Sequence, residues 1–180
     1  MTPPTTDRAS RLVYQGVRFD VCALERTGQG GMVIGREAVV APGAAVVLAL
    51  LDKQTVVLIR NERMVVGQTL WELPAGTIEP DEQPQACAGR ELVEETGYRA
   101  NELEPLIHFY PSPGICTERM HAFLARDLEH VGQHLDPNER ITVEAVSLQR
   151  ATKMIRDNTI QDGKTIATLL YHQFFFLKEP

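Results

Sequence analysis

Cysteines, long apolar runs and a leader segment are scarce or missing in this sequence of 180 residues. The three cysteines, Cys22, Cys87 and Cys116, are odd in number, and their spacing matches no zinc pattern. We therefore expect buried thiols in a reducing compartment rather than a disulfide framework. No apolar run approaches the roughly 20 residues of a membrane helix, and the N-terminus lacks the apolar core of a signal peptide. These absences predict a cytoplasmic protein without a membrane segment.

Positive charge is also in short supply. Eighteen Lys and Arg residues stand against 24 Asp and Glu residues, which gives a net charge of −6. This balance argues against a general nucleic-acid-binding or anionic-membrane surface. It permits an anionic small substrate, because a bound divalent metal ion can invert the local charge. The hydrophobic content of 43% is ordinary for a globular domain.

The chain divides into a short polar start, a β-rich extension and a main domain. Residues 1–10 are polar and rich in Pro and Thr, so we expect them to be flexible. Residues 11–40 form an N-terminal β extension, in which a Gly-rich turn at 27–31 joins strands into a hairpin. Residues 41–180 form the main domain.

The main domain begins with apolar, β-branched runs. Residues 43–51 and 55–63 are predicted to pair as buried antiparallel strands, and 71–76 is a short strand that ends at Pro and Gly. After a helix come further strands, and then two predicted helices over 149–158 and 162–177. This order of elements favours an α+β sandwich.

The first helix is expected over residues 82–96. Asp81 is its predicted N-cap, Pro84 lies in its first turn, and Gly97 stands at the position that ends it.

Three glutamates crowd on this helix. Glu91, Glu94 and Glu95 are spaced i, i+3 and i+4, so their carboxylates share one face. Their mutual repulsion is unfavourable in water by a few tenths of a kcal/mol for each pair. The spacing alone allows two interpretations, a solvated helix face or a site for a hard divalent cation with oxygen ligands.

The residues around the glutamates follow one extended pattern: Gly76, five residues, Glu82, seven residues, then Arg90-Glu91-Leu92-x-Glu94-Glu95-x-Gly97-Tyr98. This pattern resembles the Nudix box of the Nudix hydrolases, with Tyr98 in place of the closing aliphatic residue. The resemblance implies a Nudix α/β/α sandwich with a mixed sheet. It also implies hydrolysis of a nucleoside diphosphate linked to another moiety.

The resemblance gives each residue of the box an expected role. Glu91 and Glu95 would be the main ligands of Mg²⁺, for which Mn²⁺ can substitute, and Glu94 would assist. The carbonyl of Ala75 would be a further ligand, and Glu94 and Glu95 would also be catalytic. An Arg90–Glu82 ion pair and the glycines Gly76 and Gly97 would be structural. Clustered divalent ions neutralise charge that develops on phosphate oxygens and lower the pKa of bound water towards 7.

Segments outside the box resemble the ADP-ribose and nucleoside-diphosphate-sugar pyrophosphatases within this family. These segments are "WELPAG" at 71–76 and "SPGICTERMHAFLARDL" at 112–128. Their resemblance assigns Glu72, Pro113, Gly114 and Glu118 to the substrate side. Upstream, "REAVVAPGAAVVLAL" and "VVLIRNER" resemble the family's strands before the box, and their Arg36 and Arg63 are expected to contact phosphate or ribose. Plain alternatives remain for most of them, namely an ordinary turn at 112–114, a loop cap at Glu118 and surface cations at the arginines.

A general base is expected in the acidic loop before a late strand. "HLDPNERITVEAV" offers Asp136, Glu139 and Glu144, and Glu139 aligns best with the family pattern. The family has a more acidic run here than this chain, so the match is incomplete at this position.

Two wider expectations follow from the resemblance. The first is a homodimer in which residues 11–40 swap over the partner; the alternative is a hairpin on its own subunit. The second is hydrolysis of ADP-ribose or a related nucleoside diphosphate sugar to a nucleoside monophosphate and a sugar phosphate. GDP-mannose, a UDP-sugar or another dinucleotide is the alternative substrate. A non-catalytic nucleotide-sugar sensor is the alternative of another class.

Overall fold

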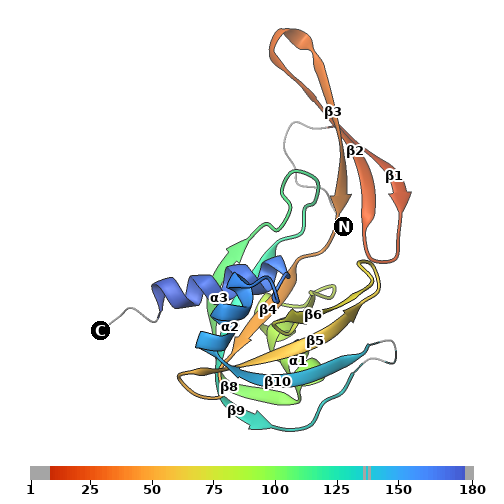
Figure 1. The fold of residues 1–180 in the computed structure, drawn as a ribbon. Helices are drawn as coiled ribbons and strands as arrows, with labels where there is room; N and C mark the ends of the chain where they lie inside the picture. Colours follow the sequence, from red (N-terminus) through yellow and green to blue (C-terminus); the bar gives the residue numbers. More distant parts are fainter. Residues whose placement is uncertain (1–8, 136, 138, 177–180) are drawn as a thin grey trace. The chain divides into compact units, whose positions relative to one another are not determined.

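A computed structural model describes residues 9–135, 137 and 139–176 (Figure 1). The chain divides into two compact units. The first contains residues 1–43 and 110–119, and the second contains residues 44–109 and 120–180.

The first unit is built on a three-stranded antiparallel sheet of order β1-β2-β3. Its strands are β1 (Ala9–Gln15), β2 (Asp20–Thr27) and β3 (Val33–Val40), and the 3-10 turn η1 (Gln29–Gly31) joins the last two. The predicted hairpin is therefore confirmed. The loop 110–119 adds to this unit, because Val39 exchanges backbone hydrogen bonds with Ile115 and Thr117 at 2.7 and 2.9 Å.

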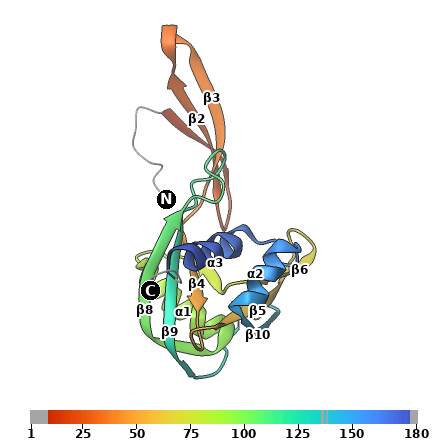
Figure 2. The same cartoon turned by 60° about the vertical axis from the view of Figure 1, so that its left-hand side comes forward.

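The second unit contains two sheets (Figure 2). A mixed sheet of order β7-β4-β9-β8 combines one parallel pair, β4 with β9, and two antiparallel pairs. Its strands are β4 (Ala44–Ala49), β7 (Ala75–Thr77), β8 (Tyr98–Phe109) and β9 (Met120–His130). The other sheet, of order β10-β5-β6, is antiparallel and consists of β5 (Thr55–Arg63), β6 (Gln68–Glu72) and β10 (Ile141–Ser147).

The predicted pairing of 43–51 with 55–63 is wrong. Both segments are strands, β4 and β5, but they belong to different sheets and share one isolated bridge, Leu50 with Val56. Every residue of β4 is buried, and so are most residues of β5. A strand that is apolar on both faces does not reveal its neighbours, because no alternation marks a solvent side. The turn at 51–54 carries the chain from one sheet to the other.

Three helices complete the second unit: α1 (Pro84–Thr96), α2 (Leu148–Arg156) and α3 (Gly163–Phe175). Alternate residues of β4 feed two core clusters. Val46 and Leu48 pack in the cluster that α2 and α3 cover, whereas Ala45 and Val47 pack in the cluster that α1 covers. The helices thus lie on both sides of β4, which confirms the expected α+β sandwich. Within the described residues, none of the helices has the length and apolar character to span a membrane.

Candidate active site

The start of α1 differs from the prediction. Gln83, with φ −81° and ψ 145°, is the N-cap, and Pro84 is at the first helical turn. Asp81 lies in the preceding loop with φ 65° and does not cap the helix. The reason is Pro84, because a residue before proline is pushed out of the helical region, so the helix cannot begin earlier.

The end of α1 agrees with the prediction. Gly97 adopts a left-handed φ of 76° and donates its N–H to the Val93 carbonyl at 2.9 Å. A Cβ atom at Gly97 would come within 2.8 Å of the Gln133 backbone nitrogen. Conformation and space therefore both favour glycine here.

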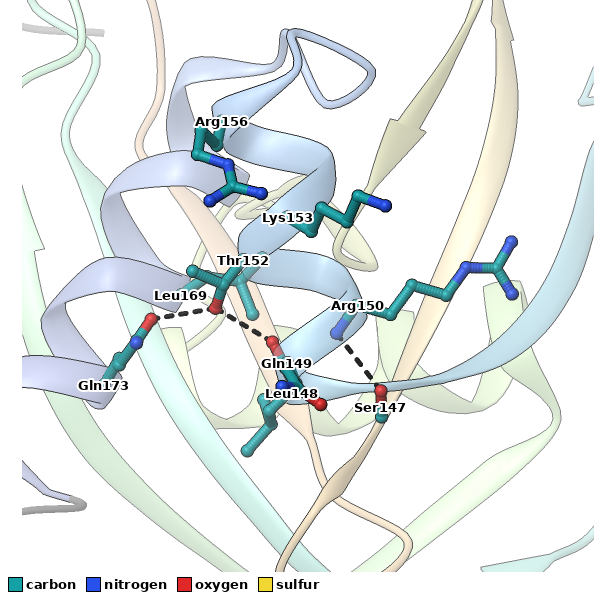
Figure 3. A pocket seen from close by; sticks show the side chains of 9 residues that line it. All are labelled: Ser147, Leu148, Gln149, Arg150, Thr152, Lys153, Arg156, Leu169 and Gln173. Carbon is teal, nitrogen blue, oxygen red and sulfur yellow. Dashed lines mark hydrogen bonds between the residues drawn. The ribbon is translucent and has the colours of Figure 1, made fainter.

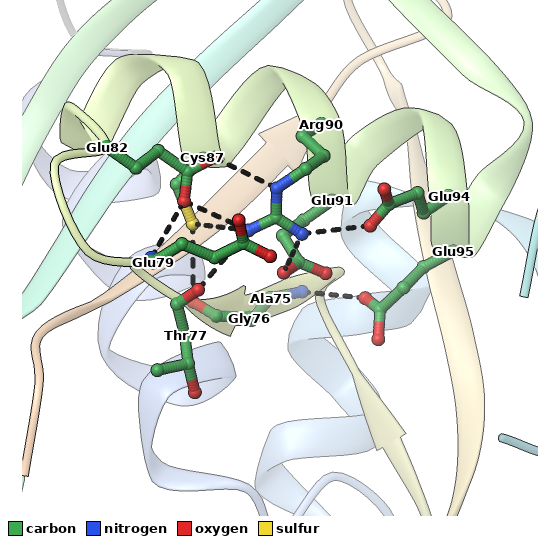
Figure 4. Close-up of polar contacts among 10 residues, drawn as sticks. All are labelled: Ala75, Gly76, Thr77, Glu79, Glu82, Cys87, Arg90, Glu91, Glu94 and Glu95. Carbon is green, nitrogen blue, oxygen red and sulfur yellow. Dashed lines mark hydrogen bonds and ion pairs between the residues drawn. The ribbon is translucent and has the colours of Figure 1, made fainter. Parts of the chain in front are cut away.

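Arg90 is shared by three carboxylates (Figure 4). Its Nε and Nη2 donate to the two oxygens of Glu82 at 2.9 and 3.1 Å, which is the expected ion pair. This bond holds the pKa of Glu82 down at about 2. The remaining Nη1 donates to Glu91 Oε1 at 2.7 Å and to Glu94 Oε2 at 2.9 Å. One guanidinium thus lies between two of the predicted metal ligands.

Gly76 leaves room for Glu91. A Cβ atom at Gly76 would lie 1.9 Å from Glu91 Oε1, which no real contact permits. The carboxylate of Glu91 therefore packs directly against the backbone of β7. Only 9% of Glu91 is exposed, and this burial raises the pKa of its carboxyl group.

Glu95 is the most buried of the three helix glutamates, with 2% of its surface exposed. Its Oε2 accepts a hydrogen bond from the Ala75 N–H at 2.8 Å. Burial raises the pKa of Glu95 to about 8, and the negative charges of Glu91 and Glu139 add to the rise. The charge of Glu139 also raises the pKa of Glu91, which places the predicted base in the same electrostatic field.

The donor set fits a hard divalent cation. Burial raises the pKa values of the Glu91 and Glu95 carboxyl groups, and Glu94 lies on the same helix face. Among the described residues, no group of three or more acidic, histidine or cysteine side chains is arranged to hold a metal ion by itself. Arg90 Nη1 contacts Glu91 and Glu94, two of the predicted ligands. The arrangement suits an open site that shares its cation with substrate and water, as Mg²⁺ sites do.

A second cluster of charges joins β5, β6 and α3. Arg63 donates to both oxygens of Glu72, from Nε at 2.7 Å and from Nη2 at 2.6 Å. Lys164 donates to Glu72 Oε2 at 2.5 Å and contacts Asp162 Oδ1 at 2.9 Å. Burial alone would raise the pKa of Glu72, which is 1% exposed, but these cations outweigh it and lower the pKa. Sequence reasoning missed Lys164, and no local pattern links it to a strand residue 92 positions away.

Arg63 also borders a cavity of about 470 Å³ beside the β5–β6 turn. Glu62, Thr69 and Arg140 are among its other lining residues. Arg140 is the neighbour of Glu139, so this cavity lies next to the loop that carries the predicted base.

A further cavity, of about 640 Å³, lies between α2 and α3 (Figure 3). Arg150, Lys153 and Arg156 of α2 line it together with Leu169 and Gln173 of α3. These helices cover the opposite core cluster from α1. The cavity is therefore separate from the acidic face of α1, which Glu91, Glu94 and Glu95 form.

The other predicted substrate residues belong to the first unit. Arg36 lies on β3, and Pro113, Gly114 and Glu118 lie in the loop 110–119. Ser112 accepts backbone hydrogen bonds at its carbonyl from Ile115 at 3.1 Å and Cys116 at 2.9 Å, so 112–116 is a tight turn. Glu144 lies on β10, and Asp136 falls outside the described residues.

Known proteins resemble this chain in sequence and in fold. A model of the NUDIX domain matches residues 41–169. ADP-ribose pyrophosphatase of Bacillus subtilis is 35% identical over 92% of this chain and 90% of its own length. GDP-mannose pyrophosphatase of Citrobacter koseri is 39% identical over 72% of each chain. A crystal structure of an ADP compounds hydrolase superposes with a TM-score of 0.83 at 20% identity, over 98% of this chain and 97% of that one.

These matches and the geometry of α1 agree. The matched region contains the whole pattern from Gly76 to Tyr98, the two sheets of the second unit and all but the last turns of α3. The fold neighbour has the same architecture over nearly its full length. The chain belongs to the Nudix hydrolase family.

Proposed function

We propose that this protein hydrolyses the pyrophosphate of ADP-ribose or a related nucleoside diphosphate sugar, giving a nucleoside monophosphate and a sugar phosphate. The observation that carries the proposal is the pair of buried carboxylates, Glu91 and Glu95, which pack against the strand of Ala75 and Gly76 and whose pKa values burial raises. The Bacillus subtilis relative, aligned over 92% of the chain, supports the choice of substrate.

Mg²⁺ is the proposed cofactor, and Mn²⁺ can take its place. Glu91, Glu94, Glu95 and the carbonyl of Ala75 would hold it. When bound, a divalent ion neutralises the charge of the pyrophosphate oxygens and makes water a better nucleophile near neutral pH. Four residues of the chain thus prepare an anionic, oxygen-lined site for a cation.

Glu139 is the proposed general base. The negative charge of Glu139 raises the pKa values of Glu91 and Glu95, so Glu139 interacts electrostatically with the acidic face of α1. A carboxylate there can accept a proton from the attacking water. Its neighbour Arg140 and the more distant Arg63 border the same cavity, where guanidinium groups can bind phosphate oxygens.

The remaining residues of the proposal bind and orient the substrate. Glu72 holds Arg63 through two hydrogen bonds, which fixes the direction of its guanidinium. Arg36, Pro113, Gly114 and Glu118 of the first unit are proposed to contact the nucleoside or the sugar.

The direct test is Glu95→Gln, assayed with ADP-ribose and Mg²⁺. Losing one charged ligand is expected to lower kcat at least about 100-fold, because several kcal/mol of charge stabilisation disappear. Glu144→Gln on β10 is the matched control and is expected to keep wild-type turnover. Near-wild-type turnover of Glu95→Gln would contradict the metal assignment.

GDP-mannose is the second candidate substrate. The Citrobacter koseri relative has the higher identity, 39%, although it aligns with a smaller share of the chain. A screen of ADP-ribose, GDP-mannose and UDP-sugars, scored by phosphate release after a coupled phosphatase, decides between them. Inactivity on every diphosphate would favour a non-catalytic nucleotide-sugar sensor.

We also propose a homodimer in which residues 11–40 contact the partner. Leu12, Val13 and Tyr14 are three consecutive residues of β1, and each is more than half exposed. The strand β1 therefore offers exposed apolar surface to a partner. Light scattering tests this: Leu12→Glu with Tyr14→Glu is expected to give monomers. An unchanged mass, or a monomeric wild type, would contradict the dimer.

A cytoplasmic location is part of the proposal. The three cysteines are free in the structure, and Cys22 and Cys87 are buried. Burial raises the pKa of Cys87 to about 12, so this thiol is unreactive at neutral pH. Such thiols suit a reducing compartment.

A further inference from the structure

The segment Leu73–Ala75 runs from the end of β6 into the first residue of β7, and neighbouring elements hold its last two residues. Pro74 accepts a hydrogen bond at its carbonyl from the Val47 N–H of β4 at 2.9 Å. Ala75 donates its N–H to Glu95 Oε2 of α1 at 2.8 Å (Figure 4). The position of this short segment therefore sets where the Glu95 carboxylate and the Ala75 backbone meet.

The first residue of the segment is held by α3. The N–H of Leu73 donates to Thr165 Oγ1 at 2.8 Å, and both residues are 0% exposed. Thr165 Oγ1 in turn donates to Asp162 Oδ2 at 2.6 Å, and Asp162 is the N-cap of α3. The hydroxyl is thus used as acceptor and as donor, which fixes its direction.

The hydrogen bond between Leu73 and Thr165 matters because the next residue, Pro74, cannot donate one. Pro74 has no N–H, so Leu73 supplies the last backbone donor before Ala75. A buried N–H without an acceptor is strongly unfavourable, and the segment would shift to find another partner or water. A shift of Leu73 is passed through one rigid proline residue to Ala75.

We propose that Thr165 is a positioning residue for the metal site: its hydroxyl holds the segment Leu73–Ala75 in place and thereby aligns Ala75 with the Glu95 carboxylate. The inference rests on the proposed function, because it concerns the same cation site. Thr165 lies outside the box of residues 76–98 and acts through Leu73 rather than on the substrate. Partners of this kind, which orient metal ligands, typically change metal affinity 10- to 100-fold when removed.

The test compares two buried threonines of α3. Thr165→Val replaces the hydroxyl by a methyl group of similar size and leaves Leu73 without its acceptor. Thr168→Val is the matched control, because Thr168 is also 0% exposed and its hydroxyl has no hydrogen-bond partner in the part of the chain that the structure describes. Thr165→Ser keeps a hydroxyl and serves as the rescue variant. Binding of Mn²⁺ alone is followed by the EPR signal of the free ion.

Thr165→Val is expected to weaken Mn²⁺ binding about tenfold or more. Thr168→Val and Thr165→Ser are expected to stay within about threefold of the wild type. In the Mg²⁺-dependent assay, Thr165→Val should lower kcat more than it changes KM, since the segment positions the reacting site rather than the whole substrate. Equal Mn²⁺ affinity of the two valine variants would overturn the inference.

Amide hydrogen exchange of the wild type provides a test that needs no variant to fold. If the segment moves as one piece, the N–H groups of Leu73 and Ala75 exchange with protection factors that agree within about threefold. A protection factor of the Ala75 amide about tenfold or more below that of the Leu73 amide would overturn the inference.

The outcomes separate this inference from the proposed function. A wild type that binds no divalent cation and cleaves no diphosphate contradicts the proposed function itself. A wild type that binds Mn²⁺ and is active, combined with a Thr165→Val variant that matches Thr168→Val, contradicts only the role of Thr165.

Discussion

Glu72 and Glu95 are both almost fully buried glutamates of the second unit, and their surroundings have opposite effects. Glu72 receives hydrogen bonds from Arg63 and Lys164, and its pKa is lowered in spite of burial. Glu95 receives one from the neutral Ala75 N–H, and burial, together with the negative charges of Glu91 and Glu139, raises its pKa to about 8. At Glu72, two cationic side chains of the protein neutralise the buried carboxylate. At Glu95 no cationic side chain in the described part of the chain donates a hydrogen bond to the carboxylate, so a bound metal ion can neutralise it instead.

A Glu→Gln substitution should therefore lower the free energy of unfolding at Glu72 and raise it at Glu95 in the metal-free protein. The largest effect is expected for Glu72→Gln, which removes the carboxylate that Arg63 and Lys164 share. It should lower the free energy of unfolding by about 3 kcal/mol, the lower end of the range for a broken buried pair, because Arg63 is 38% exposed and partly solvated. Urea unfolding measures this loss. A variant as stable as the wild type would show that the network contributes nothing net.

Glu95→Gln should stabilise the metal-free protein at alkaline pH. The folded-state pKa of Glu95, about 8, lies above its ordinary value of 4.5. A group with a raised folded pKa gives stability that is fully present below the ordinary value and is lost as pH rises through the folded one. The metal-free wild type should thus lose stability between pH 4.5 and 8, and Glu95→Gln, which has no ionisable group at this position, should avoid most of this loss. Parallel pH profiles of unfolding for both proteins would contradict this.

Gly76→Ala should weaken cation binding without removing a charge. The added Cβ would lie 1.9 Å from Glu91 Oε1, so the carboxylate must leave its place against β7. We expect about a tenfold loss of Mn²⁺ affinity, or about 1.4 kcal/mol, as for other changes that misorient a metal ligand. EPR titration is the measurement. Unchanged affinity would mean that Glu91 binds the cation from another position.

Gly89→Ala supplies the smallest effect and a control for Gly76. A Cβ at Gly89 would meet only Leu103 Cδ2, at an ordinary 3.9 Å, among the described neighbours. The substitution should raise the free energy of unfolding by about 1 kcal/mol, because alanine favours a helix interior over glycine. Chemical unfolding of the variant and the wild type measures this gain. The Mn²⁺ affinity of Gly89→Ala should equal that of the wild type, which makes it the control for Gly76→Ala. A loss of stability would show that α1 packs more tightly at this point than the structure indicates.

Much of α1 could be predicted from the local sequence, whereas contacts between residues far apart in the chain could not. Residue types and spacing predicted the helix and its end at Gly97, because these depend on neighbours along the chain. The Arg90–Glu82 pair was predicted by the resemblance to the Nudix box. The contact of Arg90 with Glu94, at i and i+4, was readable from spacing but was not predicted. The contacts of Lys164 with Glu72 and of Thr165 with Leu73 each join residues 92 positions apart. No periodic pattern encodes such pairs.

The sheets show the same limit. Strands β4 and β5 were located correctly, since runs of Val, Leu and Ile mark buried strands. Their partners were not, because burial on both faces removes the alternation that would distinguish one sheet from the other.

The most direct measurement of the central claim is the stabilisation by Mg²⁺ of three proteins at pH 8: the wild type, Glu95→Gln and Glu72→Gln. A ligand that binds only the folded state adds about 2.7 kcal/mol at 100 times its Kd. We predict a gain of this size for the wild type and for Glu72→Gln, relative to each metal-free form, and a much smaller gain for Glu95→Gln. Equal gains in all three proteins, or no gain in the wild type, would contradict the assignment of the cation site to the acidic face of α1.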